Sequence, residues 1–565
     1  MIGVIFLSLI GIWLISNFYS LLRNYQAARR AGIPIFVVPW NMYNPLWMIP
    51  SVPLQPYLQK YLPSSWYEHI NVATYGFEFR NARNSLHDKY GDAIILVTSG
   101  PMELSTSDPE LAAEVLKRLK EFPPTKQTGV IMNIFGPSIL TSEGENWARQ
   151  RKLIAPNINE KISALVFGES ISQARQMSES YMNDSNGVTN TTMQGMKAIA
   201  MNVLGLAGFG IQMPWKSGEN EQPAYGHRLT YMEATKIVVE NLVAAAVFPA
   251  RMLLLPIFPP AWQMIGHAKN EFPIHTRRML EQERIVQASG KETRSNLMSK
   301  MVEMEDKKTN SDSKTTFKNQ SLSQEEIEGN LFVFTSAGFD TSANTMAYAL
   351  AQMATHPQWQ DWLYEEIHAV LGNKSIDKLE YNEIFPRLPR CLALLFETMR
   401  LFPPLTHISK QAHEEGDVTV TTPSNRTYII PRKSIVYVNT VAIHRDPKIW
   451  GMDPHTFNPA RWLIDPLSPP GTSTITNVRT MPRGTFLPWS MGPRVCPGMK
   501  FSQVEFVGVF MTIFAEYRVE PVKLWDGENE KDITERFEKV MMDSAPIMTL
   551  QMTRNQDLKV RWVRR

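Results

Sequence analysis

The chain opens with an apolar run without charge. Residues 1–22 carry no charged side chain and are about long enough to cross the hydrocarbon layer of a membrane as a helix. Arg23, Arg29 and Arg30 follow, and a positive flank places what comes next on the cytoplasmic side. No basic region precedes the run and no small-residue cleavage site follows it, which favours an uncleaved anchor. A cleaved signal or a buried helix is the alternative.

Prolines dominate the stretch that follows. They stand at Pro34, Pro39, Pro45, Pro50, Pro53 and Pro56. Because proline has no backbone N–H and clashes with a preceding helical turn, this spacing predicts an irregular segment. Residues 23–71 are therefore expected to form a proline-rich lead-in, and residues 72–565 to form the main domain.

Regular patterns begin near residue 72. Residues 91–108 predict a strand, a turn at Ser99-Gly100-Pro101 and a second strand, and Asp108 is a helix cap for the segment after it. Residues 160–300 are helical in pattern and rich in methionine. Within them, residues 244–265 are strongly apolar with four prolines and are read either as buried core or as a surface segment. Residues 305–323 are polar and predict a mobile surface loop.

Composition bounds the fold and the partners. At 565 residues with 43% hydrophobic side chains the chain can bury a large core, and no linker of low complexity divides it, so one large fold is expected. A net charge of +3 is too small to indicate a nucleic-acid partner. Two cysteines exclude a disulfide framework and indicate a reducing compartment.

One of those cysteines lies in a loop of unusual composition. Cys496 sits in WSMGPRVCPG, where glycines and prolines exclude regular structure and Gly498 permits a close approach of the backbone. Arg494 places a positive charge near the sulfur and favours the thiolate. No histidine base lies within thirty residues, and Cys391, the other cysteine, is far upstream in an apolar run, which disfavours a nucleophile and a zinc site. The remaining interpretation is that Cys496 is the single thiolate ligand of a haem iron.

A long helix is expected upstream of this loop. Ser323 and Glu326 have the spacing of a capping box, and no proline follows until Pro357. Within the helix, AGFDT places Asp340 and Thr341 side by side. Thr341 can bond back to a carbonyl one turn earlier and bend the helix. A helix-packing seam of small residues is the alternative, and it leaves the aspartate unexplained.

Two further motifs pair charged and aromatic residues. Trp147 and Arg151 are four residues apart, so they share a helix face. Glu397 and Arg400 form a pair three residues apart amid apolar neighbours, where burial requires full pairing. Each motif alone fits an ordinary amphipathic helix or ion pair.

Together the four motifs, in their order along the chain, resemble those of the cytochrome P-450 superfamily. The loop matches its G-x-R-x-C-x-G pattern, with Trp489 where phenylalanine is usual, a larger aromatic ring that could cover the sulfur. The resemblance implies a haem-binding role for a set of residues: Trp147, Arg151, His407, Trp489, Arg494, Cys496 and Gly498. In the family the first two are donors to a haem propionate, and the position of His407 either bonds a propionate or lines the pocket.

The resemblance also implies roles for the long helix and for the ion pair. Ala337 and Gly338 would line the substrate and oxygen pocket, and Asp340 and Thr341 would deliver protons for oxygen activation. Arg461, in PHTFNPARW, matches the arginine that joins the glutamate–arginine pair. In the family the apolar segment 244–265 is a substrate-access lid and a second membrane contact.

The resemblance implies a mainly helical cytochrome P-450 fold with a smaller β-rich part, preceded by a transmembrane helix in the endoplasmic reticulum membrane. Heme b is the expected cofactor and monooxygenation of a lipophilic small molecule the expected reaction. NADPH would supply electrons through a flavoprotein reductase, with Lys152 and Lys500 as candidate docking residues. Fungal secondary-metabolite enzymes acting on terpenoids, polyketides or alkaloids are the nearest resemblance, with fatty acids as the alternative substrate. A redox-independent isomerase or dehydratase and a non-catalytic haem sensor are the alternative functions.

Overall fold

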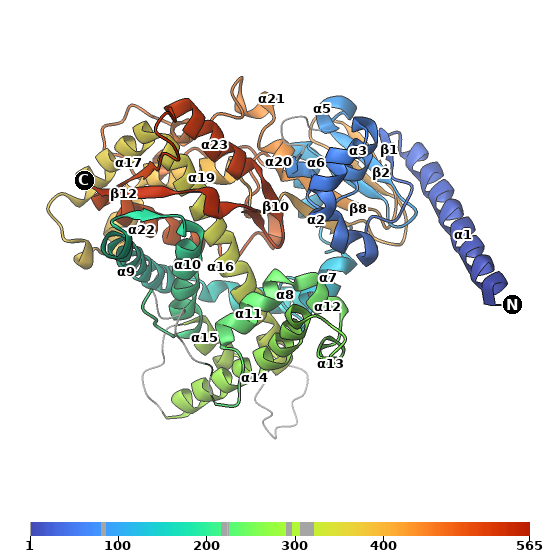
Figure 1. Ribbon diagram of the computed structural model, residues 1–565, viewed down its shortest axis with the longest axis horizontal. Coiled ribbons are helices and arrows are strands. Elements are labelled where there is room, and N and C mark those ends of the chain that lie inside the picture. Colours follow the sequence, from blue (N-terminus) through green and yellow to red (C-terminus); the bar gives the residue numbers. More distant parts are fainter. Residues whose placement is uncertain (1, 81–85, 216–222, 224, 290–295, 306–320) are drawn as a thin grey trace.

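Helices build most of the molecule, and one mixed sheet lies at the side from which the first helix projects (Figure 1). The computed structural model describes residues 2–80, 86–215, 223, 225–289, 296–305 and 321–565, with the side chains of residues 2–6 and 377 outside the description. The expected mobile loop at 305–323 lies mostly outside the described residues.

The helices follow one another along the chain as α1 (Ile2–Ala31), α2 (Pro45–Tyr61), α3 (Ser64–Val72), α4 (Phe77–Arg80), α5 (Leu86–Tyr90), α6 (Pro109–Lys117), α7 (Lys126–Met132), α8 (Gly144–Ile154), α9 (Glu160–Ser185), α10 (Thr192–Phe209), α11 (Tyr231–Glu240), α12 (Leu242–Val247), α13 (Ala250–Leu253), α14 (Pro260–Ala288), α15 (Leu297–Glu303), α16 (Gln324–Thr355), α17 (Pro357–Leu371), α18 (Tyr381–Ile384), α19 (Pro389–Leu401), α20 (Thr440–Ile443), α21 (Pro447–Trp450), α22 (Met499–Glu516) and α23 (Glu530–Met542).

The strands are β1 (Ile35–Val37), β2 (Ala93–Val97), β3 (Glu103–Thr106), β4 (Val188–Thr189), β5 (His407–Gln411), β6 (Val418–Thr421), β7 (Thr427–Ile430), β8 (Ile435–Asn439), β9 (Tyr517–Pro521), β10 (Ser544–Pro546), β11 (Leu550–Met552) and β12 (Val560–Arg564). The largest sheet has the order β1-β2-β3-β8-β5. Its β1–β2 and β3–β8 pairs are parallel, and its β2–β3 and β8–β5 pairs are antiparallel. β8 and β5 carry this sheet to the wall of the central cavity.

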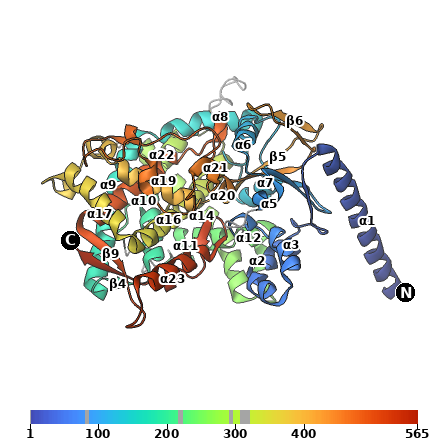
Figure 2. The same cartoon turned by 90° about the horizontal axis from the view of Figure 1, so that it is seen from above.

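Helix α16 runs through the interior and is buried along most of its length, as Figures 1 and 2 show. The predicted capping box begins it: the Ser323 hydroxyl accepts from the Glu326 N–H, and the Glu326 carboxylate accepts from the Ser323 N–H. α9, α10, α19 and α22 share its hydrophobic core. The helix therefore carries residues 337–345 to the centre of the molecule.

The sequence patterns around β2 and β3 are confirmed. The two strands pair antiparallel across the predicted turn, from Ala93 opposite Thr106 to Leu96 opposite Glu103. The Asp108 carboxylate caps α6 by accepting from the Glu110 N–H at 2.9 Å.

The irregular structure predicted from the prolines between Pro34 and Pro56 is wrong from Pro45 on, where the chain is helical. β1 pairs with β2, and α2 and α3 are helical. Asn44 caps α2, Pro45 occupies its first position, and Pro50, Pro53 and Pro56 lie inside it at intervals of three residues. Because Pro53 and Pro56 are exposed, water can satisfy the carbonyls that these prolines leave without a donor. Helix and proline therefore coexist at the surface.

Helix α1 projects from the body and is fixed only at its C-terminal end (Figures 1 and 2). There the Asn24 amide donates to the carbonyls of Thr98 and Gly100, and Ala28 is buried. The transmembrane span expected over residues 1–22 is not found. Among the described residues, no helix is long and apolar enough to cross a membrane. From residue 7 on, serines and Asn17 interrupt the apolar run before it reaches Arg23, and the first six residues of the expected span lie outside the described side chains.

The apolar segment 244–265 is a surface segment for part of its length and core for the rest. Ala245, Leu253 and Ile265 are buried, whereas Leu255 and Ile257 are exposed. The segment forms α12, α13 and the start of α14, and it lies along the cavity. The reading as wholly buried core is therefore wrong.

Candidate active site

A cavity of about 1190 Å³ lies between α16 and the cysteine loop. Its walls come from segments far apart in sequence, among them α7, α8, α16, β5 and the loop 488–498. Cys496 lies on this wall, and so do Ala337, Gly338 and Thr341 of α16. The chain thus brings three of the sequence motifs to one space.

The loop that carries Cys496 is closed by backbone bonds. The Cys496 N–H donates to the Trp489 carbonyl at 2.9 Å. Gly492 has φ +72°, and a Cβ there would stand 2.7 Å from the Leu116 carbonyl oxygen, so this position requires glycine. At Gly498 a Cβ would stand 3.8 Å from the Cys496 sulfur, which is an ordinary contact within the protein.

The electrostatics of the sulfur differ from the expectation. Burial raises the pKa of the Cys496 thiol, while the Gly498 N–H and the Arg151 guanidinium oppose that shift. Cys496 is nevertheless accessible, and it lines the cavity. The cation that favours the thiolate is Arg151, not the neighbouring Arg494, whose side chain is drawn away by the carbonyls of Leu140 and Ser142.

The same end of the cavity is lined by cations that have no carboxylate partner within the described ranges. Arg494 stacks on the Trp147 ring at 4.7 Å, and its Nε is buried without a hydrogen-bond partner among the described residues. Arg151 Nη1 donates to the Val495 carbonyl at 2.9 Å. Burial lowers the pKa of Arg494 to about 10. A buried donor without an acceptor is costly, so the site is built for an absent acceptor.

Lys410 on β5 belongs to this group and was not found from the sequence. It is buried on the cavity wall, and among the described residues no carboxylate lies within ion-pair distance of it. Burial and the nearby Arg494 lower its pKa to about 8. A signal was available, because Lys410 is the one lysine in the buried strand that also carries His407. These cations, together with one cavity-facing thiol, fit a haem whose propionates would pair with them.

Trp489 and His407 take specific places on the cavity wall. The Trp489 indole N–H donates to the Ser502 hydroxyl at 3.0 Å, which holds the ring beside the cysteine loop. His407 Nδ1 lies 2.9 Å from Glu78, a fully buried carboxylate, and its ring stacks on Tyr437. The structure therefore places His407 on the pocket lining with Glu78 as its partner, a contact that the sequence did not suggest.

Asp340 and Thr341 point to different sides of α16. Thr341 lines the cavity and its hydroxyl donates to the Ala337 carbonyl at 2.8 Å, the predicted contact one turn earlier. Asp340 is buried behind the wall, where the Thr549 hydroxyl donates to it at 2.5 Å and Lys197 lies 3.8 Å away. Burial raises the pKa of Asp340, against the effect of Thr549 and Lys197.

Thr549 therefore connects the aspartate with the cavity. The residue lines the cavity, and its hydroxyl donates to Asp340 and accepts from the Asn344 amide at 2.8 Å. Thr549 and Lys197 were missed in the sequence because neither stands near AGFDT. Lys197 comes from α10 and Thr549 precedes β11, and only the packing of these elements on α16 brings them together.

The glutamate–arginine motif forms a closed polar network. Glu397 and Arg400 are both 0% exposed and pair at 2.8 Å. Arg461 joins at 3.0 Å from Glu397, and Trp462 donates its indole N–H to the same carboxylate. Arg400 also donates to the carbonyls of His444, Pro454 and Thr456. The pair is thus fully satisfied in the interior, as burial of two charges requires.

Comparison with known proteins agrees with this arrangement. The sequence model of the family Cytochrome P450 matches residues 62–550. The chain is 31% identical to the phomenoic acid biosynthesis cluster cytochrome P450 monooxygenase of Leptosphaeria maculans, over 94% of this chain and 93% of that protein. It is 28% identical to a cytochrome P450 monooxygenase of Arthrobotrys oligospora, over 99% and 98%. A crystal structure of a cytochrome P450 superposes with a TM-score of 0.64 at 18% identity, covering 86% of this chain and 93% of the other.

The chain belongs to the cytochrome P450 family and is a cytochrome P450 monooxygenase. The family implies a haem cofactor, and fungal relatives of secondary metabolism indicate a biosynthetic role.

Proposed function

We propose that this enzyme inserts one oxygen atom into a lipophilic small molecule of secondary metabolism, with Cys496 as the thiolate ligand of heme b. The observation that carries the proposal is the cavity itself. A single cavity-facing thiol lies at one end of it, close to cations that have no carboxylate partner among the residues that the structure describes.

The residues would divide into three roles. Cys496 would hold the iron, while Arg494, Lys410, Arg151 and Trp147 would hold the propionates. When bound, the haem supplies activation of O₂, with one atom entering a C–H bond of the substrate, the other leaving as water, and NADPH supplying the electron pair through a flavoprotein reductase. The protein's task is then to orient the substrate, exclude water and deliver protons.

Proton delivery would use both sides of α16. Thr341 faces the cavity, where its hydroxyl can accept or donate beside the reacting centre. Asp340 is held by Lys197 and Thr549, and Thr549 reaches the cavity. The raised pKa of Asp340 brings its protonated form closer to neutral pH, which suits a group that passes protons.

The cavity walls favour an apolar substrate. Away from the cations its lining is mainly aliphatic and aromatic, with Leu204, Val243, Val333 and Ile547 among its residues. One relative carries the name of a biosynthesis cluster, for phomenoic acid, in its description. A terpenoid, polyketide, alkaloid or fatty-acid-like substrate fits this lining.

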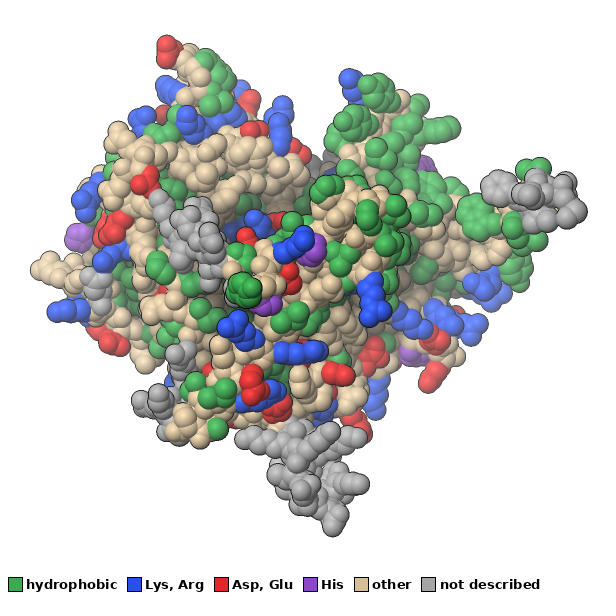
Figure 3. All heavy atoms as spheres, turned by 60° about the horizontal axis from the view of Figure 1, so that its bottom comes forward, with side chains coloured by type: hydrophobic (Ala, Val, Ile, Leu, Met, Phe, Trp, Pro, Cys, Tyr) green, Lys and Arg blue, Asp and Glu red, His purple; other side chains and the backbone are tan. Residues whose placement is uncertain are grey.

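Membrane association would suit such a substrate. Hydrophobic side chains gather on one part of the surface (Figure 3). Helices α2 and α3 and the segment beside α13 carry exposed apolar side chains. Leu46 of α2 is 86% exposed, Trp66 of α3 is 67% exposed and Ile257 beside α13 is 82% exposed. With α1, this surface would hold the enzyme on the endoplasmic reticulum membrane, with the catalytic domain in the cytoplasm. Lipophilic substrates could then reach the cavity from the lipid.

The reductase would approach on the thiolate side. Lys152 is exposed at the end of α8, one residue after Arg151. Lys500 is half-buried over the Phe385 ring at 4.1 Å, and burial lowers its pKa. Lys152 is therefore the better contact for an acidic partner, and Lys500 is a weaker one.

The experiment is reconstitution with a flavoprotein reductase. Microsomes containing the reductase and either the wild type or Cys496→Ala are incubated with NADPH, ¹⁸O₂ and a lipid extract from cells that lack the gene. A product labelled with ¹⁸O in the wild type alone supports the proposal. Conversion that is independent of NADPH and unlabelled would favour an isomerase, and haem binding without oxygen consumption would favour a sensor.

A further inference from the structure

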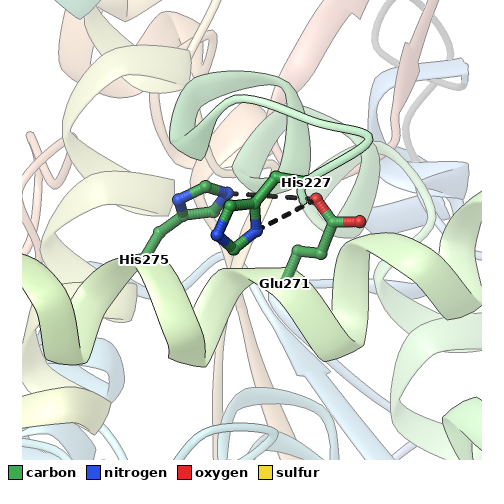
Figure 4. A group of neighbouring side chains, drawn as sticks. All are labelled: His227, Glu271 and His275. Atoms are coloured by element: carbon green, nitrogen blue, oxygen red, sulfur yellow. Dashed lines mark ion pairs between the residues drawn. The ribbon is translucent and has the colours of Figure 1, made fainter. Parts of the chain in front are cut away.

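Two histidines and a glutamate meet on the outer helices, away from the thiolate. His227 lies in the short segment before α11, and Glu271 and His275 stand one turn apart on α14. Figure 4 shows both imidazole rings turned toward the same carboxylate oxygen of Glu271. None of these residues is among the residues lining the central cavity.

The ligand atoms are close enough to share one ion. His227 Nδ1 lies 3.8 Å and His275 Nε2 lies 3.9 Å from Glu271 Oε2, and the three atoms all lie within 4.8 Å of one another. In a tetrahedral site with bonds of about 2.0–2.2 Å, neighbouring ligand atoms are roughly 3.3–3.6 Å apart. Small shifts of side-chain torsion would therefore bring all three to bonding distance.

The Glu271 carboxylate is held in place by backbone hydrogen bonds. The backbone N–H groups of Arg228 and Leu229 both donate to Glu271, at 3.1 Å and 2.9 Å, so its position does not depend on the histidines. His275 Nε2 lies 2.9 Å from the Leu229 carbonyl, which can only accept, so this nitrogen carries the proton of that hydrogen bond and must lose it to bind an ion. The guanidinium of Arg228 contacts His267, at 3.1 Å from its Nε2. The two backbone N–H groups therefore orient the carboxylate, as an outer shell does in metal sites.

We propose that His227, Glu271 and His275 bind a divalent transition-metal ion, with Zn²⁺ as the best match. Two imidazoles and one carboxylate suit Zn²⁺, whereas Ca²⁺ and Mg²⁺ prefer all-oxygen sites. His227 is partly exposed, which leaves one side of the site open for a water ligand.

An ion here would connect α11 with α14, two helices that line the cavity. His227 leads directly into α11, whose C-terminal end lines the cavity mouth at Val239 and Glu240, and α14 contributes Trp262 and Ile265 to the same cavity. Metal binding would hold the start of α11 against α14. The site would therefore stiffen the cover of the cavity without touching the thiolate end.

The test measures Zn²⁺ directly on tag-free holoprotein. After treatment with EDTA, the protein is dialysed against graded Zn²⁺, and bound zinc is counted against haem iron by elemental analysis. We expect a single saturable Zn²⁺ in the wild type. His227→Ala, at the open rim, should weaken its binding by at least about tenfold, since loss of outer-shell partners alone costs that much. Zn²⁺ should raise the unfolding temperature of the wild type and not that of His227→Ala.

The control is His69→Ala, which removes an exposed histidine of α3 outside the cluster. It should bind Zn²⁺ as the wild type does. Glu271→Gln and His275→Gln should repeat the loss, and the spectrum of the haem–carbon monoxide complex verifies that each variant is folded. Equal zinc binding by the wild type and His227→Ala, or no saturable zinc in the wild type, would overturn the proposal.

Discussion

The two ends of the cavity differ in the side chains that surround them. At the thiolate end, the neighbouring interior packs Glu397, Arg400 and Arg461 into a closed network. Arg494 and Lys410 line the cavity wall there, and neither has a carboxylate at ion-pair distance in the described part of the chain. At the mouth, α2 and α12, which both line the cavity, carry apolar side chains that are exposed on the molecular surface. One end has buried charge and the other has exposed apolar surface.

The difference shows how the fold separates chemistry from access. Buried, fully paired charges tolerate little displacement, because any loosening leaves a charge without a partner in a low dielectric. That rigidity suits a cofactor that must be held in one orientation. Exposed apolar helices have fewer constraints and suit an opening that admits varied lipophilic molecules. Variants at the two ends should therefore fail in different ways.

The largest effect is expected at the sulfur. Cys496→Ala should abolish the red-shifted Soret band of the reduced carbon monoxide complex, because that band requires thiolate ligation. Difference spectroscopy of the purified protein measures it. Cys391→Ser is the matched control, since Cys391 is buried away from the cavity, and it should keep the band. A surviving band in Cys496→Ala would contradict the assignment of the ligand.

Next comes the buried ion pair. Arg400→Leu removes the guanidinium that pairs with both oxygens of Glu397 and leaves this buried carboxylate with Arg461 as its remaining cation, at a cost of roughly 3–5 kcal/mol in the free energy of unfolding. We expect loss of most folded, haem-loaded protein, measured as haem per protein after purification. Arg554→Ala, which breaks a half-exposed ion pair with Asp543, should change the yield little. Normal haem content in Arg400→Leu would show that the network is dispensable.

Proton delivery should show a smaller effect that leaves the fold intact. Thr341→Ala should keep haem content and substrate affinity but lower product by about 100-fold, the lower end of what a positioned proton donor contributes, with reducing equivalents diverted to hydrogen peroxide. Asp340→Asn should slow both NADPH use and product formation, because protons no longer reach the cavity. Thr549→Val should resemble Asp340→Asn in a weaker form. Rates of NADPH consumption, peroxide and product distinguish these outcomes.

If Thr341→Ala and Asp340→Asn both form as much product per NADPH consumed as the wild type, and at the same rate, AGFDT serves only to pack helices. Gly338→Ala offers the contrast, because a Cβ there would stand 3.1 Å from Leu204. It should disturb packing and substrate binding more than the ratio of peroxide to product.

The sequence predicted those elements and site residues whose interactions are with near neighbours in the chain. The capping box of α16, the cap of α6 and the β2–β3 turn are local, and all three were predicted. The members of the buried glutamate–arginine network were recognised by motif. Lys410 and Thr549 were missed because their roles arise only when β5 and the segment before β11 pack beside α16 and the cysteine loop.

Local rules also gave wrong answers. Three prolines argued against α2, yet the capped N-terminus and the exposed side of the helix accommodate them. Arg494 was expected to be the charge beside the sulfur because it is two residues away, but loop geometry places Arg151 there. Distance along the chain was a poor guide to distance in space within this glycine- and proline-rich loop.

Lys410 gives a test that depends on pH. Its pKa is lowered to about 8 by burial and by Arg494 when no anion is present, and a propionate would favour its charged form. Haem binding should therefore take up a proton above about pH 8, so haem affinity is highest below that value and falls as the pH rises through it. Haem transfer to apomyoglobin should be a few-fold faster at about pH 9 than at about pH 7. Lys410→Arg, which stays charged, should remove this difference, and an unchanged pH dependence in Lys410→Arg would exclude Lys410 as its source.

The smallest effect is expected at the other end of the cavity, where no single contact dominates. Deletion of residues 1–30 should release part of the enzyme from membranes and leave the haem spectrum unchanged, because no cavity residue lies in that stretch. Ile257→Ser in the truncated protein should release more, since it removes an exposed apolar side chain at the cavity mouth. Leu467→Ser is the matched control: Leu467 is equally apolar and 90% exposed, but lies in the loop beside α17. Flotation with phospholipid vesicles measures the bound fraction. If Ile257→Ser and Leu467→Ser release the same amount, the exposed mouth is not a membrane surface, and access to the cavity would be from water.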